Sequence, residues 1–504
     1  MEKKKSVLNV SVAVGFRLLM LIGSILVRRY LIRYIGNEVN GLDSLYNSLI
    51  GFLSVAELGV GSAITFCMYK PIVEGDTNKV ASLYRLFVKA YRVIAITMLA
   101  VGAGMIPFLP YLAKDYAELD VNLSLTFFLM LLSVVISYVF SAKTSLINAY
   151  KNNYVTTTIS SVGMLIQYGA QIIVILTTHS FVAYLVCRIA AMVLQWIATD
   201  IYAGRHHREI LRHGKETVDA GTKKEIINKV KALFMHRVGS ILVNSADSMI
   251  ISAFIGVVLL GKYSNYSTIA LSMSSVLALV FTSLTSIIGH SYVEERENTE
   301  RYFKKMYFLN FALGVVFFLG YYAVIDDLVA ILFDGSLILT KSVSFIVTVN
   351  YFIQFMRQAT LLFRDATGTF YNDRWKPFFE GILNVILSIA FVKIFTNIGG
   401  EEFGVVGVIA ATIITNLLIC HVIEPYVLYK HAFYKPVRRH LFRNYCYIAV
   451  FIAALLALNP LLRSMENRFL ELLVNGMISI GVSAVTLLAV LLLDKSTRVG
   501  IKTK

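Results

Sequence analysis

Charged residues are scarce in this sequence. Only 15% of its 504 residues are Asp, Glu, Lys or Arg, whereas an ordinary soluble domain is about a quarter charged. Hydrophobic residues make up 57% of the chain, and its mean hydropathy is +0.69. The charges gather between apolar runs of about 20 residues, the length that crosses the hydrocarbon core of a bilayer. The composition therefore excludes a water-soluble globular protein and indicates an integral membrane protein.

Motifs for metal binding, disulfide formation and nucleotide hydrolysis are also lacking. The four cysteines are scattered, without a CxxC pair or a histidine at ligand spacing, so neither a disulfide framework nor a zinc site is expected. The sequence contains no GxxxxGK(S/T) loop and no HExxH motif, and its longest hydrophilic stretch is under about 30 residues. These absences argue against an ATP-driven pump and against an enzyme with its active site in a loop. We expect no catalytic residues.

The apolar runs predict an all-α protein that crosses the membrane about fourteen times. The first run follows MEKKK without a small-residue cleavage site, so we expect a retained first span and not a removed signal peptide. The predicted spans are roughly 7–30, 42–66, 89–112, 119–142, 155–178, 180–203, 232–256, 264–288, 306–325, 342–363, 378–396, 404–428, 446–462 and 470–493.

Basic residues lie mostly on one side of this topology. With the N-terminus in the cytoplasm, the cytoplasmic segments hold about 34 of the 47 Lys and Arg residues, and the external connections hold about 9. The positive-inside rule then predicts that both termini are cytoplasmic. The same topology accounts for the formal net charge of +16 without a nucleic-acid partner.

The two halves of the chain resemble each other at a shift of about 220 residues. The matching positions are Arg17 and Arg237, Ile35-Gly36 and Ile255-Gly256, Gly41 and Gly261, Ser44 and Ser264, Tyr46 and Tyr266, Glu74 and Glu294, and Asn78 and Asn298. An even number of spans per repeat predicts two pseudosymmetric six-helix lobes of the same orientation, with a central cavity between them. The expected divisions are an N-lobe at 1–204, a cytoplasmic linker at 205–231, a C-lobe at 232–429, and two extra helices with a cytoplasmic tail at 430–504.

Polar and basic residues within the spans predict a cationic cavity that binds an anion. Arg17, Ser24 and Arg28 are spaced by seven and eleven residues, which places them within about 20° of one line on a helix. The repeat places similar residues in the seventh span, and an Arg inside a membrane usually faces a cavity or a partner. For Arg28 the alternative is a side chain that reaches the lipid headgroups. The predicted substrate-binding residues are Arg17, Ser24, Arg28, Arg237, Asn244 and Arg357.

Acidic residues within the spans are candidates for ion coupling. A carboxylate in an apolar environment binds a proton or Na⁺ unless it is paired with a cation, and most such acids are simply paired. The candidates are Asp247, Glu57 and Glu380, with Asp43 as a further acid near a span end. Asp247 is preferred because it lies on the same predicted helix as Arg237, about 15 Å along it.

Three stretches of the sequence form a familiar pattern: IGNEVNGLDSLYNSLIGFLSVAELGVGSAITF at 35–66, NSADSMIISAFIG at 244–256 and PFFEGILNVILSIAFV at 377–392. The first stretch, followed by a basic amphipathic segment, resembles the Wzx-type polysaccharide flippases of the multidrug, oligosaccharidyl-lipid and polysaccharide exporter superfamily. The other two are similar to that family's seventh and eleventh spans.

This resemblance implies a bacterial cytoplasmic-membrane protein that moves an undecaprenyl-diphosphate-linked oligosaccharide from the inner to the outer leaflet by alternating access, for cell-surface polysaccharide biosynthesis. Arg17 best matches the arginines that engage the diphosphate in related flippases. The implied partners are the lipid-linked glycan, membrane lipids, a polysaccharide polymerase and glycosyltransferases. Two alternatives stay open: an ion-coupled multidrug exporter or antiporter of the same superfamily, and a membrane polysaccharide polymerase. An exporter of cationic drugs would favour an acidic cavity, and a polymerase would need a large external loop.

Overall fold

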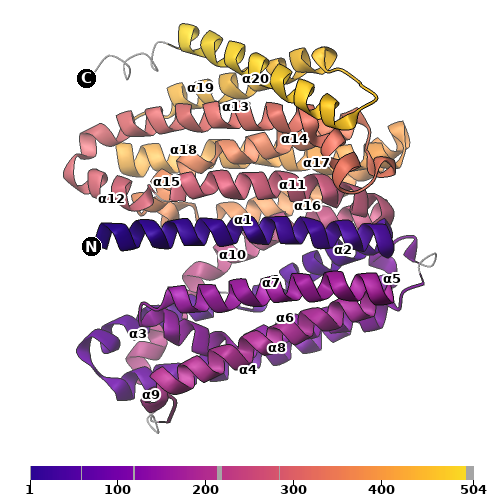
Figure 1. The fold of residues 1–504 in the computed structure, drawn as a ribbon. Coiled ribbons are helices and arrows are strands. Elements are labelled where there is room, and N and C mark those ends of the chain that lie inside the picture. The colour runs from indigo at the N-terminus through magenta and orange to yellow at the C-terminus, as the bar shows by residue number, and fades with distance from the viewer. Residues whose placement is uncertain (1, 58, 117–119, 213–217, 283, 495–504) are drawn as a thin grey trace. The chain divides into compact units, whose positions relative to one another are not determined.

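A computed structural model describes residues 2–57, 59–116, 120–212, 218–282 and 284–494. The secondary structure in these ranges is helical, with short turns between the helices and no strand (Figure 1). The prediction of an all-α membrane protein is confirmed. The helices fall into two compact units, residues 1–261 and 262–504.

Nine helices in the described ranges are long and apolar enough to cross a membrane. They cover Thr77–Leu112, Leu123–Ala149, Asn153–Thr178, Phe181–His206, Arg296–Leu332, Thr369–Gly399, Glu401–Phe433, Arg438–Leu461 and Arg468–Leu493. The other five predicted spans fall on helix α1, on α2 with α3, on α10, on α11 with α12, and on α14 with α15. Each predicted apolar run therefore coincides with a helix or with two consecutive helices.

The first unit is a bundle in which neighbouring helices run alongside each other. Its helices are α1 (Glu2–Tyr34), α2 (Asn37–Leu53), α3 (Val60–Glu74), α4 (Thr77–Met105), α5 (Leu109–Leu112), α6 (Leu123–Ala149), α7 (Asn153–Thr178), α8 (Phe181–His206), α9 (Arg208–Arg212) and α10 (Ala220–Phe254). Helix α6 packs against α4 and α8, while α7 packs against α8 and α1 (Figure 1). Glycine allows one of these close contacts, because a Cβ atom at Gly102 would lie 2.5 Å from a methyl carbon of Leu131.

Polar side chains cap the N-terminal ends of several of these helices by accepting hydrogen bonds from backbone N–H groups. Asp76 accepts from the Lys79 N–H at 2.9 Å, and Asn122 accepts from the Leu125 N–H at 3.0 Å. Asp219 accepts from both the backbone and the hydroxyl of Thr222 at the start of α10. These two bonds lower the pKa of the Asp219 carboxyl, because they stabilise its charged form.

The second unit has helix α13 near its centre. Its helices are α11 (Val257–Thr282, from Lys262 on), α12 (Thr285–Glu294), α13 (Thr299–Leu332), α14 (Lys341–Met356), α15 (Gln358–Ala366), α16 (Lys376–Gly399), α17 (Glu401–Thr415), α18 (His421–Leu428), α19 (Arg438–Leu458) and α20 (Arg468–Leu493). Helix α13 packs against α14, α15, α19 and α20, and α16 packs against α17. Aromatic rings fill the space around α13. Among them, Phe352 of α14 stacks on Phe451 of α19 with ring centroids 3.6 Å apart.

Local geometry repeats where the sequence predicts a repeat. Gly36 separates α1 from α2 with φ of 131°, and Gly256 separates α10 from α11 with φ of 142°. Both conformations are strained for residues with a side chain, which explains why the Ile-Gly pair occurs at both turns. Tyr46 and Tyr266 are each fully buried and each hydrogen-bonded, Tyr46 to Thr126 at 3.0 Å and Tyr266 to Asp326 at 2.8 Å.

A reciprocal contact joins α2 to the first turns of α11. A Cβ atom at Gly41 would collide with the carbonyl oxygen of Val257, and one at Gly261 would collide with the carbonyl oxygen of Asn37. The two glycines are repeat-related positions, and so are the residues that they meet. The amide nitrogen of Asn37 also donates to the carbonyl of Val258 at 2.9 Å. These backbones can approach so closely only because both crossing positions lack a side chain.

Candidate functional site

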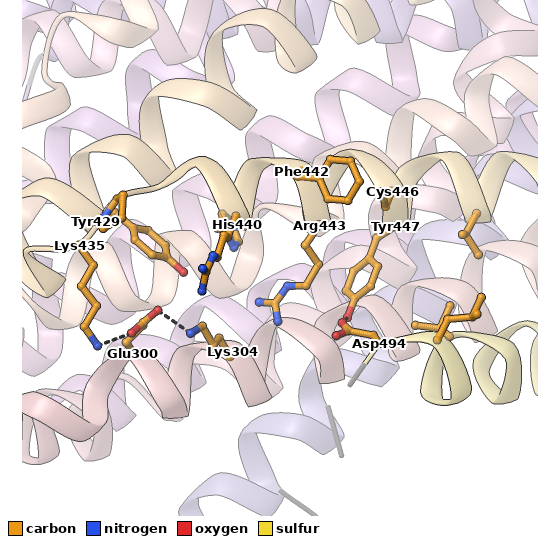
Figure 2. A pocket seen from close by; sticks show the side chains of 15 residues that line it. Glu300, Lys304, Tyr429, Lys435, His440, Phe442, Arg443, Cys446, Tyr447 and Asp494 are labelled. Atoms are coloured by element: carbon orange, nitrogen blue, oxygen red, sulfur yellow. Dashed lines mark hydrogen bonds and ion pairs between the residues drawn. The ribbon is translucent and has the colours of Figure 1, made fainter. Parts of the chain in front are cut away.

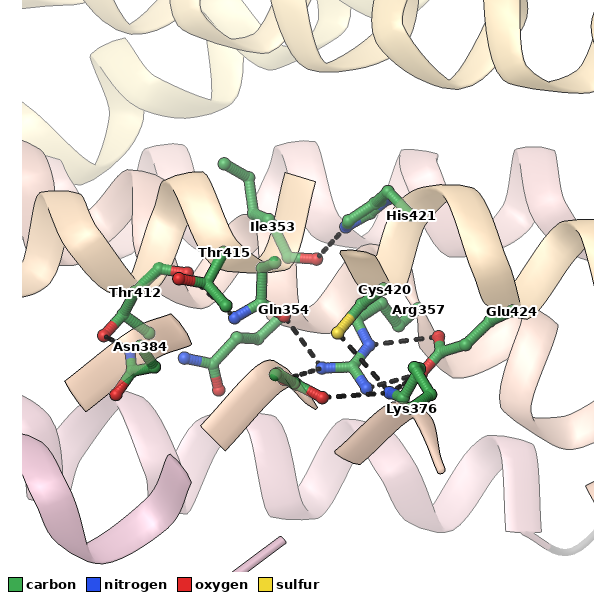
Figure 3. Close-up of polar contacts among 12 residues, drawn as sticks. Ile353, Gln354, Arg357, Lys376, Asn384, Thr412, Thr415, Cys420, His421 and Glu424 are labelled. Atoms are coloured by element: carbon green, nitrogen blue, oxygen red, sulfur yellow. Dashed lines mark hydrogen bonds and ion pairs between the residues drawn. The ribbon is translucent and has the colours of Figure 1, made fainter. Parts of the chain in front are cut away.

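A buried ion-pair network lies in the second unit where three helices meet (Figure 3). Arg357 follows the last residue of α14 and lies between α14 and α15. Its guanidinium donates two bonds to the Glu424 carboxylate of α18, from Nη2 to Oε1 at 2.6 Å and from Nε to Oε2 at 3.1 Å. Nη1 donates to Asn416 Oδ1 at 2.8 Å. This two-pronged geometry is among the strongest that arginine forms with a carboxylate.

Lys376 and Glu380 of α16 complete the network. The Lys376 ammonium lies 2.6 Å from Glu424 Oε1 and 3.1 Å from Glu380 Oε2. Glu380 Oε1 lies 3.8 Å from Arg357 Nη1. The side chains of Lys376, Glu380 and Glu424 are between 1% and 5% exposed, and that of Arg357 is 17% exposed. The two cations and two carboxylates balance in charge, and their mutual attraction offsets part of the desolvation cost of burying them.

A π-helical segment, Asn416–Cys420, contributes residues to this network. It joins α17 to α18, and such segments widen a helix and are frequent at functional sites. Beyond it, His421 bridges the carbonyl of Ile353 at 3.0 Å and the side chain of Asn444 at 3.1 Å. Asn384 of α16 donates to the Thr412 hydroxyl of α17 at 2.8 Å. The network and its surroundings therefore connect α14, α16, α17, α18 and α19 through side chains.

A second charged cluster lies in the first unit, on α1, α2 and α8. Asp43 of α2 interacts electrostatically with Arg28 of α1 and with Arg188 of α8. Asn47 donates to Asp43 Oδ2 at 3.0 Å, whereas the buried Asp43 Oδ1 has no hydrogen-bond partner among the described residues. All three charged side chains are only partly exposed. Among the side chains that the structure describes here, two arginines thus lie near one carboxylate.

Glu57 lies in a separate polar pocket of the first unit. It occupies the short 3₁₀ turn Ser54–Glu57, and Tyr91 of α4 donates to its Oε1 at 2.5 Å. The pocket has a volume of about 440 Å³, and its polar lining includes Thr65 and Asn148. A carboxylate with one hydrogen bond beside such a pocket has room for a bound proton, water or cation.

The structure brings some of the predicted residues together and leaves others apart. Glu380 and Arg357 belong to one network, and Arg28 lies on α1 one turn after Ser24, whose hydroxyl donates to the Leu21 carbonyl at 2.8 Å. Asp247 is half-buried on α10. Three predicted side chains fall outside the described part of the structure: Arg17 on α1, and Arg237 and Asn244 on α10.

Sequence reasoning missed several residues that the geometry makes prominent. Glu424 and Lys376 are charged residues within or beside predicted spans, so the rule that singled out Glu380 would also have found them. Lys376 and Glu380 are also four residues apart on one helix, which is the spacing of a facing pair. The π-helical segment leaves no comparable signal in hydropathy. Among the described residues no group of three or more His, Cys, Asp or Glu side chains is placed to hold a metal ion.

A scan against protein-family models finds no match for this sequence, and a search of curated proteins finds none either. Solved structures do match. The lipid II flippase MurJ in an inward closed conformation has a TM-score of 0.66 at 13% identity, covering 94% of this chain and 97% of its own. An inward-facing multidrug resistance MATE family transporter of the MOP superfamily has a TM-score of 0.59 at 15% identity, covering 81% and 96%. A MATE transporter in a bent conformation has a TM-score of 0.51 at 17% identity, covering 87% and 96%. The chain thus has the fold of the MOP-superfamily transporters.

Proposed function

We propose that the chain is a flippase that moves an undecaprenyl-diphosphate-linked oligosaccharide from the inner to the outer leaflet of the bacterial cytoplasmic membrane. It works by alternating access and serves the biosynthesis of a cell-surface polysaccharide. Similarity to a lipid II flippase over 94% of the chain supports a lipid-linked substrate. Glycosyltransferases and a polysaccharide polymerase are the proposed partners, acting on the glycan before and after it is moved.

The observation that carries this proposal is the pair of arginines, Arg28 and Arg188, beside Asp43 in the α1–α2–α8 cluster. Both arginines interact with the Asp43 carboxylate, and all three side chains are only partly exposed. Excess positive charge in a poorly solvated place attracts an anion, and a guanidinium binds phosphate oxygens through two parallel hydrogen bonds. Ser24 lies one turn away on the same helix, with its hydroxyl donating to the Leu21 carbonyl. A diphosphate fits this combination of charge and donors better than a cationic drug does.

Arg17, Arg237 and Asn244 extend the proposed anion site along α1 and α10. Arg17 lies eleven residues from Arg28 on one continuous helix, about 16 Å along its axis. Arg357 is less available to bind a substrate anion. Its guanidinium is engaged by Glu424, so a substrate anion would have to displace a bidentate carboxylate in order to bind it.

We propose that the energy for net transport comes from Na⁺ or H⁺ bound at one of three acids. Asp247 shares helix α10 with Arg237, so ion binding there can alter the position of the proposed anion site. Glu57 has a polar pocket beside it, and Glu380 has Lys376 within 3.1 Å. Because Glu380 already has a cation beside it, Glu57 is a stronger candidate than Glu380.

A multidrug exporter is the second candidate, and the Glu57 pocket is the observation that favours it. An acid at a polar pocket suits a cationic substrate, and MATE transporters share the fold. The two functions differ in the charge of the cargo. Replacing Glu57 with Gln would abolish drug export if Glu57 binds the drug, whereas it would leave diphosphate-lipid binding intact in a flippase.

The proposal is tested by following a fluorescent undecaprenyl-diphosphate oligosaccharide in reconstituted vesicles. Arg28→Ala should reduce flipping about tenfold or more, because one charge-assisted hydrogen bond contributes about 1.5–3 kcal/mol. Arg28→Lys should recover part of the activity, since lysine keeps the charge but not the planar fork. Arg33→Ala is the matched control, an exposed arginine in the last turn of the same helix. Equal rates for Arg28→Ala and Arg33→Ala would refute the anion site.

A further inference from the structure

A large cavity opens on the second unit where the ends of α13, α18, α19 and α20 meet (Figure 2). Its volume is about 990 Å³, which is large enough for a phospholipid headgroup with part of its chains. The lining comes from the first turns of α13 and α19, the π-helical segment Tyr429–Phe433 that follows α18, and the last turn of α20. Among the residues proposed for transport, none whose side chain the structure describes lines it.

Cations outnumber acids in this cavity. Its lining contains four basic side chains, Lys304, Lys435, Arg439 and Arg443, and two acids, Glu300 and Asp494. Lys304 and Lys435 both pair with Glu300, at 2.6 and 2.5 Å, as Figure 2 shows. The second acid, Asp494, accepts a hydrogen bond from Tyr447 at 2.8 Å. Basic side chains thus outnumber acidic ones in the described lining, which makes it complementary to an anion.

His440 adds an unsatisfied polar group to the same wall. Its side chain is 3% exposed, yet neither ring nitrogen has a hydrogen-bond partner among the described residues. The ring is held by aromatic neighbours, with centroids 4.6 Å from Tyr307 and 5.4 Å from Tyr429. Buried polar groups normally have a partner, and an imidazole beside a cationic cavity is suited to donate to an anionic oxygen.

The other side of the cavity is apolar and open. Phe442 and Leu493 are 74% and 81% exposed, and Cys446, Val450 and Val490 continue this lining along α19 and α20. These helices are membrane spans by length and hydropathy, so their exposed faces meet acyl chains. The segment 430–443, which supplies three of the four basic side chains of the described lining, is predicted to be cytoplasmic. A ligand of this cavity therefore needs an anionic head at the membrane surface and hydrocarbon chains below it.

We infer that this cavity binds an anionic phospholipid of the cytoplasmic leaflet, its phosphate lying among Arg439, Arg443 and His440 and its acyl chains along α19 and α20. The cavity shares no described residue with the proposed transport site, and the proposal depends on the predicted topology only for the choice of leaflet. Basic pockets between membrane helices are a known way of holding phosphate headgroups. Such a lipid would connect α13, α19 and α20 at their predicted cytoplasmic ends.

The test is native mass spectrometry of the full-length purified protein titrated with phosphatidylglycerol or with phosphatidylcholine. Phosphatidylglycerol should bind at least tenfold more tightly than phosphatidylcholine. Arg439→Ala combined with Arg443→Ala should weaken phosphatidylglycerol binding at least tenfold, since each charge-assisted bond lost corresponds to a factor of about ten. Arg438→Ala is the matched control, because Arg438 is an exposed arginine of the same helix turn that does not line the cavity.

Two further variants separate lipid binding from folding. Arg443 packs over Tyr307, with its guanidinium carbon 5.6 Å from the ring centroid, so its replacement also alters packing. Arg439→Glu changes an exposed residue and should abolish the preference for phosphatidylglycerol at an unchanged unfolding temperature. His440→Phe keeps an aromatic ring in place and should weaken binding severalfold.

Competition experiments identify the source of the phosphate. Inorganic phosphate at millimolar concentration should leave the bound phosphatidylglycerol in place, because the apolar wall holds the chains. Displacement by inorganic phosphate would overturn the lipid assignment. Equal affinity for the two phospholipids would also overturn the lipid assignment. The same holds if the cavity variants lose no more affinity for phosphatidylglycerol than Arg438→Ala does. Undecaprenyl diphosphate that binds here and excludes phosphatidylglycerol would also overturn it. The readout is lipid retention, so a failure of the proposed flippase activity leaves this test unaffected.

Discussion

Replacing Glu424 with Gln is expected to destabilise residues 262–504 strongly. Glutamine keeps the volume of the side chain but removes the charge that accepts from Arg357 at 2.6 and 3.1 Å and from Lys376 at 2.6 Å. Glu380 then faces both cations in this network. Removal of one member of a buried ion pair leaves an uncompensated charge and costs about 3–5 kcal/mol. We expect a loss of this order in the free energy of unfolding.

The thiol of Cys420 provides a local assay. It is fully buried and lies 3.4 Å from the Lys376 ammonium, within the network that the substitution disturbs. In a variant that lacks the other three cysteines, the temperature at which a thiol-reactive dye labels Cys420 measures the opening of this region. Glu424→Gln should lower that temperature markedly. Glu466→Gln, at an exposed acid between α19 and α20, should not change it.

A double-mutant cycle separates the ion pair from general damage. The combined variant Arg357→Gln with Glu424→Gln should be more stable than the sum of the single effects predicts, because it removes both charges of the bidentate pair. If Glu424→Gln leaves both the labelling temperature and the unfolding temperature at the wild-type values, the network does not hold these helices together and the reasoning is refuted.

Other predictions concern the repeat-related positions and coupling. Gly41→Ala and Gly261→Ala should each destabilise the protein by about 1–3 kcal/mol in thermal unfolding, because the added Cβ atom would meet backbone atoms at both positions. Gly104→Ala should not destabilise the protein, because the space around Gly104 is open. Equal effects of all three substitutions would contradict the close helix crossing. Tyr266→Phe should cost about 2 kcal/mol, measured in the same way, because it removes the bond to a buried carboxylate and leaves a backbone N–H without its acceptor. Asp247→Asn should remove the dependence of flipping on an imposed Na⁺ or proton gradient without abolishing substrate binding, and an unchanged dependence would exclude Asp247 as the coupling acid.

The sequence was a good guide to the helices because hydropathy acts over a whole span. A run of about 20 apolar residues must be helical in a membrane, since every backbone group needs an internal hydrogen bond. The Ile-Gly pairs at 35–36 and 255–256 were identified only as repeat-related positions, and the structure shows that each glycine lies at a turn with positive φ. The single span expected at 342–363 is divided at Arg357. Hydropathy did not indicate that break, because it counts apolar residues and is insensitive to where a helix is interrupted.

The partners of the charged residues were less predictable. Arg357 and Glu424 are 67 residues apart in the sequence, and the choice of Glu424 as partner depends on how α14, α16 and α18 pack. Spacing along one helix can pair Lys376 with Glu380, but it says nothing about a third helix. The cavity beside His440 escaped prediction for the same reason, because its lining comes from helix ends that are distant in sequence.

The most direct test of the proposed function measures the cargo of the wild-type protein. Vesicles containing the purified protein are loaded on one leaflet with a fluorescent undecaprenyl-diphosphate oligosaccharide, and its arrival in the opposite leaflet is followed by a membrane-impermeant quencher, in parallel with uptake of a cationic dye. The flippase assignment predicts protein-dependent arrival of the lipid-linked sugar and no uptake of the dye. Uptake of the dye, with no movement of the lipid-linked sugar above that in protein-free vesicles, would contradict it.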